Sequence, residues 1–472
     1  MSGTAIVWFR NDLRLADHPA LDAAMRSGRR IIALYVLDDE SAGDWRMGAA
    51  SRWWLHHSLT ALANDLAGYG VALTLRRGRG LFVLENLVAE TGADAVYWNR
   101  LYEPWAMRRD AEIKAQLRAR GLTVESFNGG LLFEPTTLRN KSGAPFRVFT
   151  PFWRACLAAP PPDAPLPAPG KLAAAPAPAS DRLGEWALSP TRPDWAGGLR
   201  DAWTPGEKPA LARLKSFLAK DVANYKKARD FMALPGVSRL SPHLHFGEIS
   251  VRQCWAAAMK KGGDGANAFL REIGWREFCH HLLVVNPDMP ERALDARFAD
   301  FPWRDDPKAL QAWQRGRTGY PLVDAAMREL WQTGYQHNRA RMVTASFLVK
   351  HLLIAWQVGE SWFHDTLVDA DLANNSGGWQ WVAGCGADAA PYFRVFNPVL
   401  QGEKFDPDGD YVRRYVPELA KLPARWIHRP WEAPPEVLRA AGVVLGRTYP
   451  LPIVDHAMAR ERALAAFATT RE

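Results

Sequence analysis

The chain has 472 residues and a mass of 52.7 kDa, which suits two or three domains with large cores and excludes a peptide-sized scaffold. Hydrophobic residues make up 48% and charged residues 23%, fractions that argue against both a disordered chain and a membrane protein. The net charge of +8 suits a polyanionic partner such as nucleic acid, although basic charge also serves plain solubility.

Cysteine and tryptophan usage narrows the choice further. The four cysteines form no C-x-x-C pair, so neither a disulfide framework nor a zinc site is expected, and a reducing compartment fits. The longest apolar run, residues 342–358, is interrupted by Lys350 and His351, and no signal peptide is recognisable. We therefore expect a cytoplasmic protein without a metal. The 21 tryptophans outnumber the 20 phenylalanines and the 11 tyrosines, which indicates that indoles serve chemistry as well as packing.

Residues 1–128 alternate short β-branched runs with segments of helical periodicity. We predict strands at Ala5–Phe9, Ile31–Leu37, Val71–Arg76, Ala93–Trp98 and Leu122–Phe127. We predict helices at His18–Ser27, Ser51–Ala67, Leu81–Thr91 and Trp105–Arg120. This alternation predicts an α/β domain with a parallel sheet covered on both faces. The segment lacks the glycine motifs of standard dinucleotide and P-loop sites, which argues against both.

The middle and the end of the chain differ from this first part. Residues 129–206 are predicted to form an interdomain connector, because eight prolines alternate with alanines between Pro160 and Pro178 and favour extended backbone. Residues 207–472 are predicted to form an all-α domain. Its amphipathic stretches are Pro209–Tyr225, Asn267–Val285, Tyr320–Gln332 and Asn338–Gln357.

Two polar segments of the helical part are candidates for chemistry. Val368–Trp381, VDADLANNSGGWQW, is the densest of them; alone, it fits a capped helix start followed by a glycine turn. Residues 238–244, SRLSPHL, place hydroxyls, a cation and a proline at a predicted helix start. Free backbone N–H groups there suit phosphate, although alone the segment also fits a simple N-cap.

Long strings spread over the whole chain carry a resemblance to one family. They are VWFRNDLRLADHPAL, WNRLYEP, SRLSPHLHFGEIS, FLREIGWREFCHHLL, TGYPLVDAAMREL, HNRARMVTASFLVKHLLIAW, DADLANNSGGWQW and DAAPYFRVFNPVLQGEKFDPDGDYVRRY. With these strings the chain resembles the DNA photolyase and cryptochrome flavoproteins, most of all the cyclobutane pyrimidine dimer photolyases of class I or III type. The resemblance implies a Rossmann-like α/β antenna domain and a helical domain that binds a U-shaped FAD.

The resemblance also implies where FAD is held. Matching positions are Tyr225, Val237, Ser238, Arg239, Leu240, Ser241, Phe269, Arg276, Asn338, Arg341, Asp369, Ala370, Asp371 and Asn375. Asn375 falls where photolyases place an asparagine against flavin N5, whereas many insect and plant cryptochromes carry Cys or Asp there. A neutral amide accepts a hydrogen bond from N5–H without readily supplying a proton, which favours repair. Arg341 and Asp369 resemble the pair beside the flavin, although an ordinary buried ion pair also fits.

Helical spacing indicates which residues share a face that could bind the substrate. Glu272, Trp275 and Arg276 share one helix face; taken alone, the indole fits a core and the two charges fit a surface pair. In the family context, Glu272, Trp275, Asn338, Met342 and Trp381 match the lesion pocket of cyclobutane dimer photolyases, where indoles stack on a flipped dinucleotide. The (6-4) photolyases use a histidine pair near Asn338 and Met342, so that class is disfavoured. Contacts with DNA phosphates are expected from Arg229, Arg339, Gln401, Lys226 and Lys404.

Two further features follow from the resemblance. Trp379, Trp356 and Trp303 align with the relay that carries electrons to the flavin, although any one of them also fits a core. With Glu272 and Asn375 they complete the expected catalytic set. Glu103 corresponds to a folate-contacting glutamate, but residues 286–294 depart from the Cys-Lys pair of some folate-binding members. Methenyltetrahydrofolate is the expected antenna, with a deazaflavin or none as alternatives.

The resemblance thus implies a monomeric lyase that repairs cyclobutane pyrimidine dimers in UV-damaged DNA by electron transfer from photoexcited reduced FAD. Two alternatives stay open. A blue-light cryptochrome would favour a long C-terminal extension, and only a short segment follows Tyr415. A DASH-type cryptochrome acts on single-stranded DNA, and its lesion pocket usually departs from Trp381 and Met342.

Overall fold

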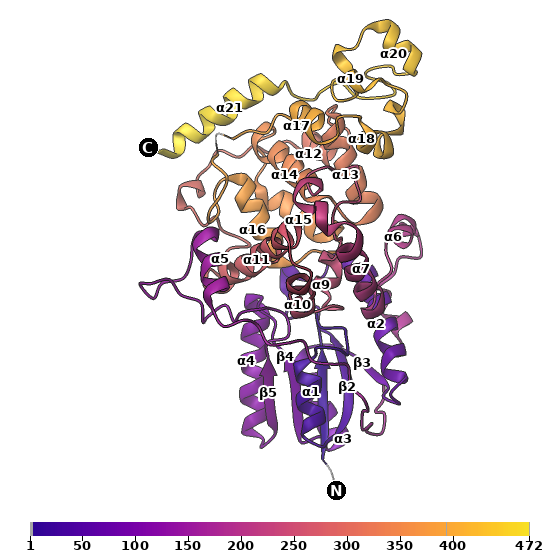
Figure 1. Ribbon diagram of the computed structural model, residues 1–472, viewed down its shortest axis with the longest axis vertical. Helices are drawn as coiled ribbons and strands as arrows, with labels where there is room; N and C mark the ends of the chain where they lie inside the picture. The colour runs from indigo at the N-terminus through magenta and orange to yellow at the C-terminus, as the bar shows by residue number, and fades with distance from the viewer. Residues whose placement is uncertain (1–2, 393, 472) are drawn as a thin grey trace.

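A five-stranded parallel sheet forms the N-terminal part of the molecule in the computed structural model, which describes residues 3–392 and 394–471. The strand order is β3-β2-β1-β4-β5. The strands are β1 (Thr4–Phe9), β2 (Arg30–Leu37), β3 (Leu73–Arg77), β4 (Ala95–Asn99) and β5 (Thr123–Phe127). Figure 1 shows that a large helical body lies beyond the ends toward which these strands run. The α/β prediction for this part is therefore confirmed.

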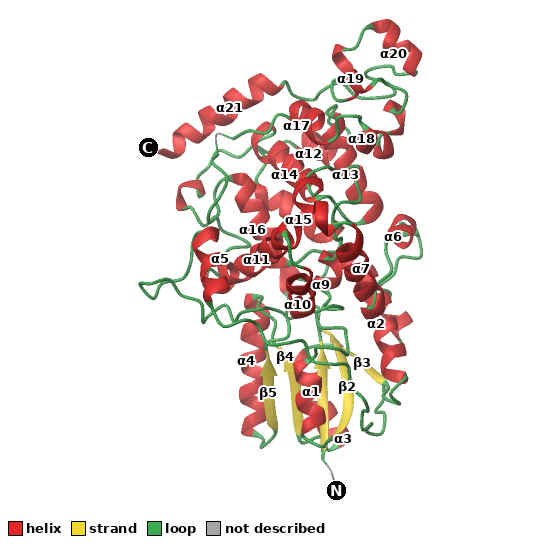
Figure 2. Cartoon of the chain, viewed as in Figure 1, coloured by secondary structure: helices red, strands yellow, loops and turns green. Residues whose placement is uncertain are grey.

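Helices cover both faces of the sheet, and its central strand β1 is buried along its whole length. Ala5, Val7 and Phe9 of β1 pack into one core cluster, whereas Ile6 and Trp8 pack into another on the opposite face. The covering helices are α1 (Pro19–Arg26), α2 (Ala49–Ala67), α3 (Gly80–Thr91) and α4 (Pro104–Ala119). All predicted strands and helices of this part start and end within two residues of the observed ones. Figure 2 shows the sheet and its helical layers.

The connector is more firmly held than its composition indicates. The backbone N–H of Ile31 donates to the carbonyl of Ala173 at 2.7 Å, and that of Ala175 donates to the carbonyl of Ile31 at 3.1 Å. The Pro/Ala segment thus pairs with β2 at one parallel bridge, between Ala174 and Ile31. Within the same connector, α5 (Phe149–Ala158) packs Phe149 and Phe152 into the core of the helical body. The division into residues 1–128, 129–206 and 207–472 stays our prediction.

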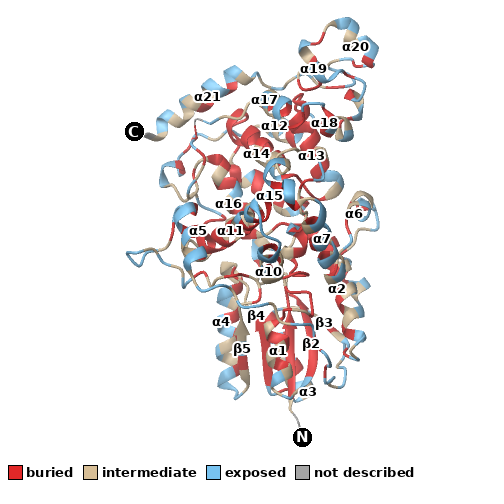
Figure 3. Ribbon diagram, in the orientation of Figure 1, coloured by how far each residue is buried: buried red, intermediate tan, exposed pale blue. Residues whose placement is uncertain are grey.

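The rest of the chain is helical, as predicted. Its helices are α6 (Gly197–Ala202), α7 (Glu207–Lys220), α8 (Tyr225–Ala228), α9 (Ser241–His245), α10 (Val251–Lys261), α11 (Asp264–Val285), α12 (Pro307–Gln314), α13 (Pro321–Thr333), α14 (Asn338–Ser346), α15 (Trp356–Thr366), α16 (Leu372–Ala383), α17 (Pro398–Phe405), α18 (Asp410–Tyr415), α19 (Ala424–Ile427), α20 (Pro435–Ala441) and α21 (His456–Ala468). Figure 3 shows the buried residues concentrated along the sheet and the middle of this body. Among the described residues, no helix combines the length and apolarity that a membrane span requires.

One predicted helix, Asn338–Gln357, is wrong because the structure divides it. α14 ends at Ser346 and continues into a π-helical turn, η5 (Phe347–His351), whose last hydrogen bond joins the N–H of Leu352 to the carbonyl of Phe347. Leu353 then adopts a φ of 55°, and α15 begins at Trp356. The segment is buried on all sides, so its apolar pattern runs through the break without a proline or glycine to mark it.

His351 makes the stability of this helical body depend on pH. Its ring is fully buried, and its Nε2 lies 2.9 Å from Nδ1 of His456 on α21. Burial lowers the pKa of His351 to about 3, whereas an exposed histidine of the unfolded chain protonates near pH 6.5. The unfolded state therefore binds a proton that the folded state refuses as the pH falls below about 6.5.

We expect this single site to cost about 2 kcal/mol of unfolding free energy between pH 7 and pH 5. His351→Gln removes the titrating ring, so the variant should lose less stability over the same interval. Urea unfolding of both proteins at pH 7 and pH 5 measures the difference. Equal losses in the parent and the variant would contradict the prediction.

Candidate functional site

The segment predicted to meet phosphate lies among aromatic rings and arginines. Arg239 adopts a φ of 52°, and its guanidinium lies 4.3 Å from the ring centre of Trp203 and 5.1 Å from that of Tyr335. Arg341 lies 5.4 Å from the same Tyr335 ring. Arg213 on α7, which the sequence reasoning missed, approaches Trp203 at 5.9 Å. The Nε of Arg239 is buried and has no hydrogen-bond partner within the described residues. The three guanidinium groups concentrate positive charge here, and this Nε–H can donate to a bound acceptor.

The two aspartates between α15 and α16 contact different helices: Asp369 contacts α14 and Asp371 contacts α11. The Arg341 guanidinium donates to both carboxylate oxygens of Asp369, at 2.9 and 2.8 Å, which confirms an ion pair between them. Asp371 instead caps α16 by accepting from the N–H of Asn374 at 2.8 Å, and it lies 3.3 Å from Nε2 of His280 on α11. Burial opposes its ionisation, but His280 outweighs this effect and holds the pKa of Asp371 well below its usual range.

Asn375 is buried in the first turn of α16, and its amide is oriented by the backbone. Its Nδ2 donates to the carbonyl of Glu360 on α15 at 3.0 Å. The side-chain oxygen of Asn375 therefore points away from that carbonyl. This is the orientation that an amide needs if its oxygen is to accept a hydrogen bond from a bound group.

The predicted substrate face is organised by contacts that sequence spacing did not reveal. Glu272 forms an ion pair with Arg229, which is 43 residues away, and does not pair with Arg276. The interpretation of Glu272 and Arg276 as a surface pair is therefore wrong. Trp275 stacks on Phe149 of α5, with ring centres 3.8 Å apart and planes at 7°. Phe149 thus covers one face of the indole and fixes the ring.

The remaining candidates for substrate contacts occupy the neighbouring surface. Asn338 is exposed, and Arg339 pairs with Asp230 at 2.8 Å, next to Arg229. Met342 and Trp381 are half-buried and pack against the same core cluster. The side-chain Oε1 of Gln401 on α17 is buried without a hydrogen-bond partner in the part of the chain that the structure describes. Tyr225 and Phe269 lie deeper, 6.0 Å apart in edge-to-face contact.

The three predicted relay tryptophans differ in burial. Trp379 and Trp356 are buried, whereas Trp303 is half-buried and lies 4.3 Å from Phe301. The ring of Trp379 lies against Gly359, one turn after Trp356 on α15. Trp379 also meets Trp313 of α12 edge-to-face at 6.2 Å. Trp313 was missed because its spacing is that of any core residue.

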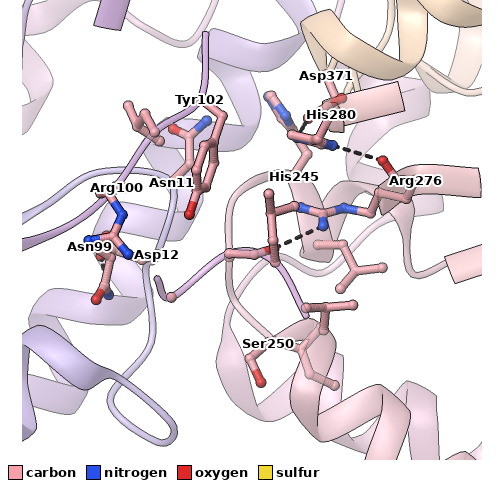
Figure 4. Close-up of a pocket in the computed structure, with 18 of the residues that line it drawn as sticks. Asn11, Asp12, Asn99, Arg100, Tyr102, His245, Ser250, Arg276, His280 and Asp371 are labelled. Atoms are coloured by element: carbon pink, nitrogen blue, oxygen red, sulfur yellow. Dashed lines mark hydrogen bonds and ion pairs between the residues drawn. The ribbon is translucent and has the colours of Figure 1, made fainter. Parts of the chain in front are cut away.

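Two cavities of about 40 and 90 Å³ lie between the sheet and the helical body. Both open at the carboxyl ends of β1 and β4, where the strand order reverses and where ligands of such sheets bind. Figure 4 shows the smaller one, with Asn11 and Tyr102 facing Arg276 and His280.

Glu103 and His245 line both cavities. Glu103 Oε2 and His245 Nδ1 are buried and lack hydrogen-bond partners among the described atoms. Burial raises the pKa of Glu103 and lowers the pKa of His245 to about 4. In the larger cavity, the Arg109 guanidinium lies 4.9 Å from the rings of both Trp8 and Trp105. The cavities therefore combine aromatic walls with unpaired polar atoms, which suits a flat polar ligand.

Comparisons with known proteins agree over the whole chain. Residues 269–469 match the family described as the FAD binding domain of DNA photolyase, and residues 5–170 match the DNA photolyase family. The deoxyribodipyrimidine photo-lyase of Agrobacterium fabrum is 54% identical over 99% of this chain and 98% of that protein. Cryptochrome-1 of Arabidopsis thaliana is 42% identical over 97% of this chain and 69% of that protein. The crystal structure of a class III photolyase from Agrobacterium tumefaciens has a TM-score of 0.97 and 53% identity, over 100% of this chain and 98% of that one.

The Arg341–Asp369 pair gives a direct test of the site's architecture. Asp369→Asn keeps the shape but removes the charge that compensates the Arg341 guanidinium, so we expect a loss of about 1–3 kcal/mol in unfolding free energy. Urea unfolding measures it. Asp163→Asn, an exposed aspartate of the connector, serves as the control and should change little. Equal stability of the two variants would show that the pair contributes nothing.

Proposed function

The chain belongs to the DNA photolyase and cryptochrome family, and from that premise we propose that it repairs cyclobutane pyrimidine dimers in UV-damaged DNA in a light-dependent reaction. The carrying observation is Asn375, a buried amide whose nitrogen is held by the Glu360 carbonyl. This leaves its oxygen free to accept a hydrogen bond from a bound flavin, at a position where many plant and insect cryptochromes carry Asp or Cys. A deoxyribodipyrimidine photo-lyase is also the activity named for the 54% identical relative. Photoreception and DASH-type action on single-stranded DNA are not favoured.

FAD fits the residues present. The buried Nε of Arg239 has no hydrogen-bond partner among the described residues. Arg213, Arg239 and Arg341 surround Trp203 and Tyr335 with positive charge that suits a pyrophosphate. Asn375 and the Arg341–Asp369 pair would lie along the flavin, where the guanidinium stabilises negative charge. When bound, the reduced flavin supplies an electron to the dimer on excitation and takes it back after both cyclobutane bonds have split, so no net oxidation occurs.

The chain's own residues would bind and orient the lesion. Phe149 stacks on one face of the Trp275 ring, and the other face would stack on a flipped pyrimidine. Arg229 pairs with the Glu272 carboxylate, which would accept hydrogen bonds from a pyrimidine edge. Arg339 and Gln401 would meet the phosphates of the damaged strand.

The antenna is proposed to be methenyltetrahydrofolate, in the larger cavity between the sheet and the helical body. Glu103 Oε2, which has no partner in the part of the chain that the structure describes, would accept hydrogen bonds from pterin N–H groups, and Trp8 and Trp105 supply aromatic walls. A deazaflavin or no antenna is the alternative. We further propose that the protein acts as a monomer in the cytoplasm.

Stacking of Trp275 on the lesion can be measured directly. Trp275→Ala should lose roughly 1–3 kcal/mol of binding to an oligonucleotide with a thymine dimer, the value of one base–aromatic stack. Binding to the same duplex without the lesion should barely change. Trp331→Ala removes an exposed indole from α13 and serves as the control. Equal losses on damaged and undamaged DNA would show that Trp275 is structural.

The relay can be separated from repair. Trp356→Phe keeps the apolar bulk but removes an oxidisable indole, so light-driven reduction of oxidised FAD should slow greatly while FAD still binds. Protein reduced beforehand with dithionite should repair dimers at close to the parent rate, because the catalytic electron does not pass through the relay. The flavin absorption spectrum follows the first reaction, and chromatography of repaired thymine follows the second.

Two outcomes would contradict the relay. Loss of FAD from Trp356→Phe would show that Trp356 chiefly packs. Normal photoreduction would show that electrons take another route, and the contact between Trp379 and Trp313 makes Trp313→Phe the next variant.

A further inference from the structure

Glu360 is a glutamate placed where no charged group is expected. It lies on α15, which packs against α16, and its side chain is fully buried. Its backbone carbonyl accepts the hydrogen bond from Asn375, and its Oε1 accepts a hydrogen bond from the hydroxyl of Ser376. A single residue of α15 therefore holds two consecutive residues of α16, Asn375 and Ser376.

The surroundings of this carboxyl favour its neutral form. Within the described residues Glu360 makes no ion pair, and its Oε2 is buried without a hydrogen-bond partner. The other ionisable groups that interact electrostatically with Glu360 are Glu291, which is itself acidic, and the Cys385 thiol. Burial raises the pKa of Glu360 well above its ordinary value, and Ser376 offsets only part of this effect. A buried carboxyl without a counter-ion thus favours its protonated, neutral form.

A neutral acid here has a consequence for the flavin side of Asn375. An ionised carboxylate beside Asn375 and Ser376 would oppose the negative charge of a reduced flavin, because charges interact strongly in a buried environment. A neutral carboxyl keeps the acceptor that Ser376 needs and adds no charge. An apolar side chain would add no charge but would leave the Ser376 hydroxyl unpaired.

We infer that Glu360 is a positioning residue that, as a neutral carboxylic acid, fixes Asn375 and Ser376 against α15 and keeps negative charge away from the N5 side of the flavin. The inference rests on the proposed function, because it assumes that FAD binds with N5 toward Asn375. It assigns Glu360 no contact with substrate or cofactor. Its effect passes through the two α16 residues that it holds.

The test compares three variants of the FAD-loaded protein without DNA. Glu360→Gln is neutral and keeps an acceptor for Ser376, whereas Glu360→Leu and Ser376→Ala each remove the same hydrogen bond from one side. The measured quantity is the equilibrium constant for flavin reduction against a reference dye. We expect the Gln variant to stay within about twofold of the parent at pH 7, and the other two to fall by about five- to tenfold, the effect of one buried hydrogen bond. The Leu/Ala double variant should fall no further.

The pH dependence of the same equilibrium constant separates this role from a purely structural one. As alkaline pH ionises Glu360, the constant of the parent should fall relative to that of the Gln variant. Asp324→Asn, a buried acid of α13 that accepts hydrogen bonds from Thr318 and Tyr449, is the matched control. It should lower stability without changing the reduction equilibrium.

Each other result overturns the inference. A change of more than about twofold in Glu360→Gln at pH 7 would mean that the carboxyl acts through its charge or its proton. Parent-like constants in both Glu360→Leu and Ser376→Ala would mean that the contact is only packing. If the Leu variant does not fold, the Gln and Ala variants still decide. If the parent itself binds no FAD, the proposed function fails, and that failure is distinct from a failure of Glu360.

Discussion

The turn from Asp369 to Asp371 is the constraint on which the rest of the site depends. Asp369 binds Arg341 of α14, while two residues later Asp371 caps α16 and meets His280 of α11. Three helices are thereby joined through one short acidic segment. The same turn sets where α16 begins, and with it the places of Asn375 and Trp379. The flavin side and the interdomain cavities are therefore built on a common support.

The fold could be predicted from the sequence wherever buried residues recur at a regular spacing. In β1 the residues alternate between two cores, and both cores are apolar, so the strand is recognisable as a short apolar run between turns. The break between α14 and α15 was not accessible. Residues from Phe347 to Ile354 are buried on all sides, so the apolar pattern gave no sign that a π turn and Leu353 in a left-handed conformation interrupt it.

The site could be predicted only in part, because some of its contacts join residues that are far apart in the sequence. Motif resemblance indicated Asp369, Arg341 and Asn375, but the Arg229–Glu272 pair depends on a tertiary contact that no spacing encodes. Arg213 and Trp313 look like ordinary members of their helices. Glu360 did carry a signal: it stands on the face of α15 that also holds Trp356 and Phe363, where a charged residue conflicts with the apolar period. Such local conflicts are the places to search for function.

The central claim is catalysis of dimer repair by light with no net oxidation. The most direct measurement is repair of an oligonucleotide with one thymine dimer by the reduced, FAD-loaded protein under anaerobic blue light, with chromatography of the restored thymines. The account predicts many turnovers per protein molecule without consumption of reductant, and none in the dark. Repair that stops after one equivalent, or no repair by protein that holds its full complement of reduced FAD, would contradict it.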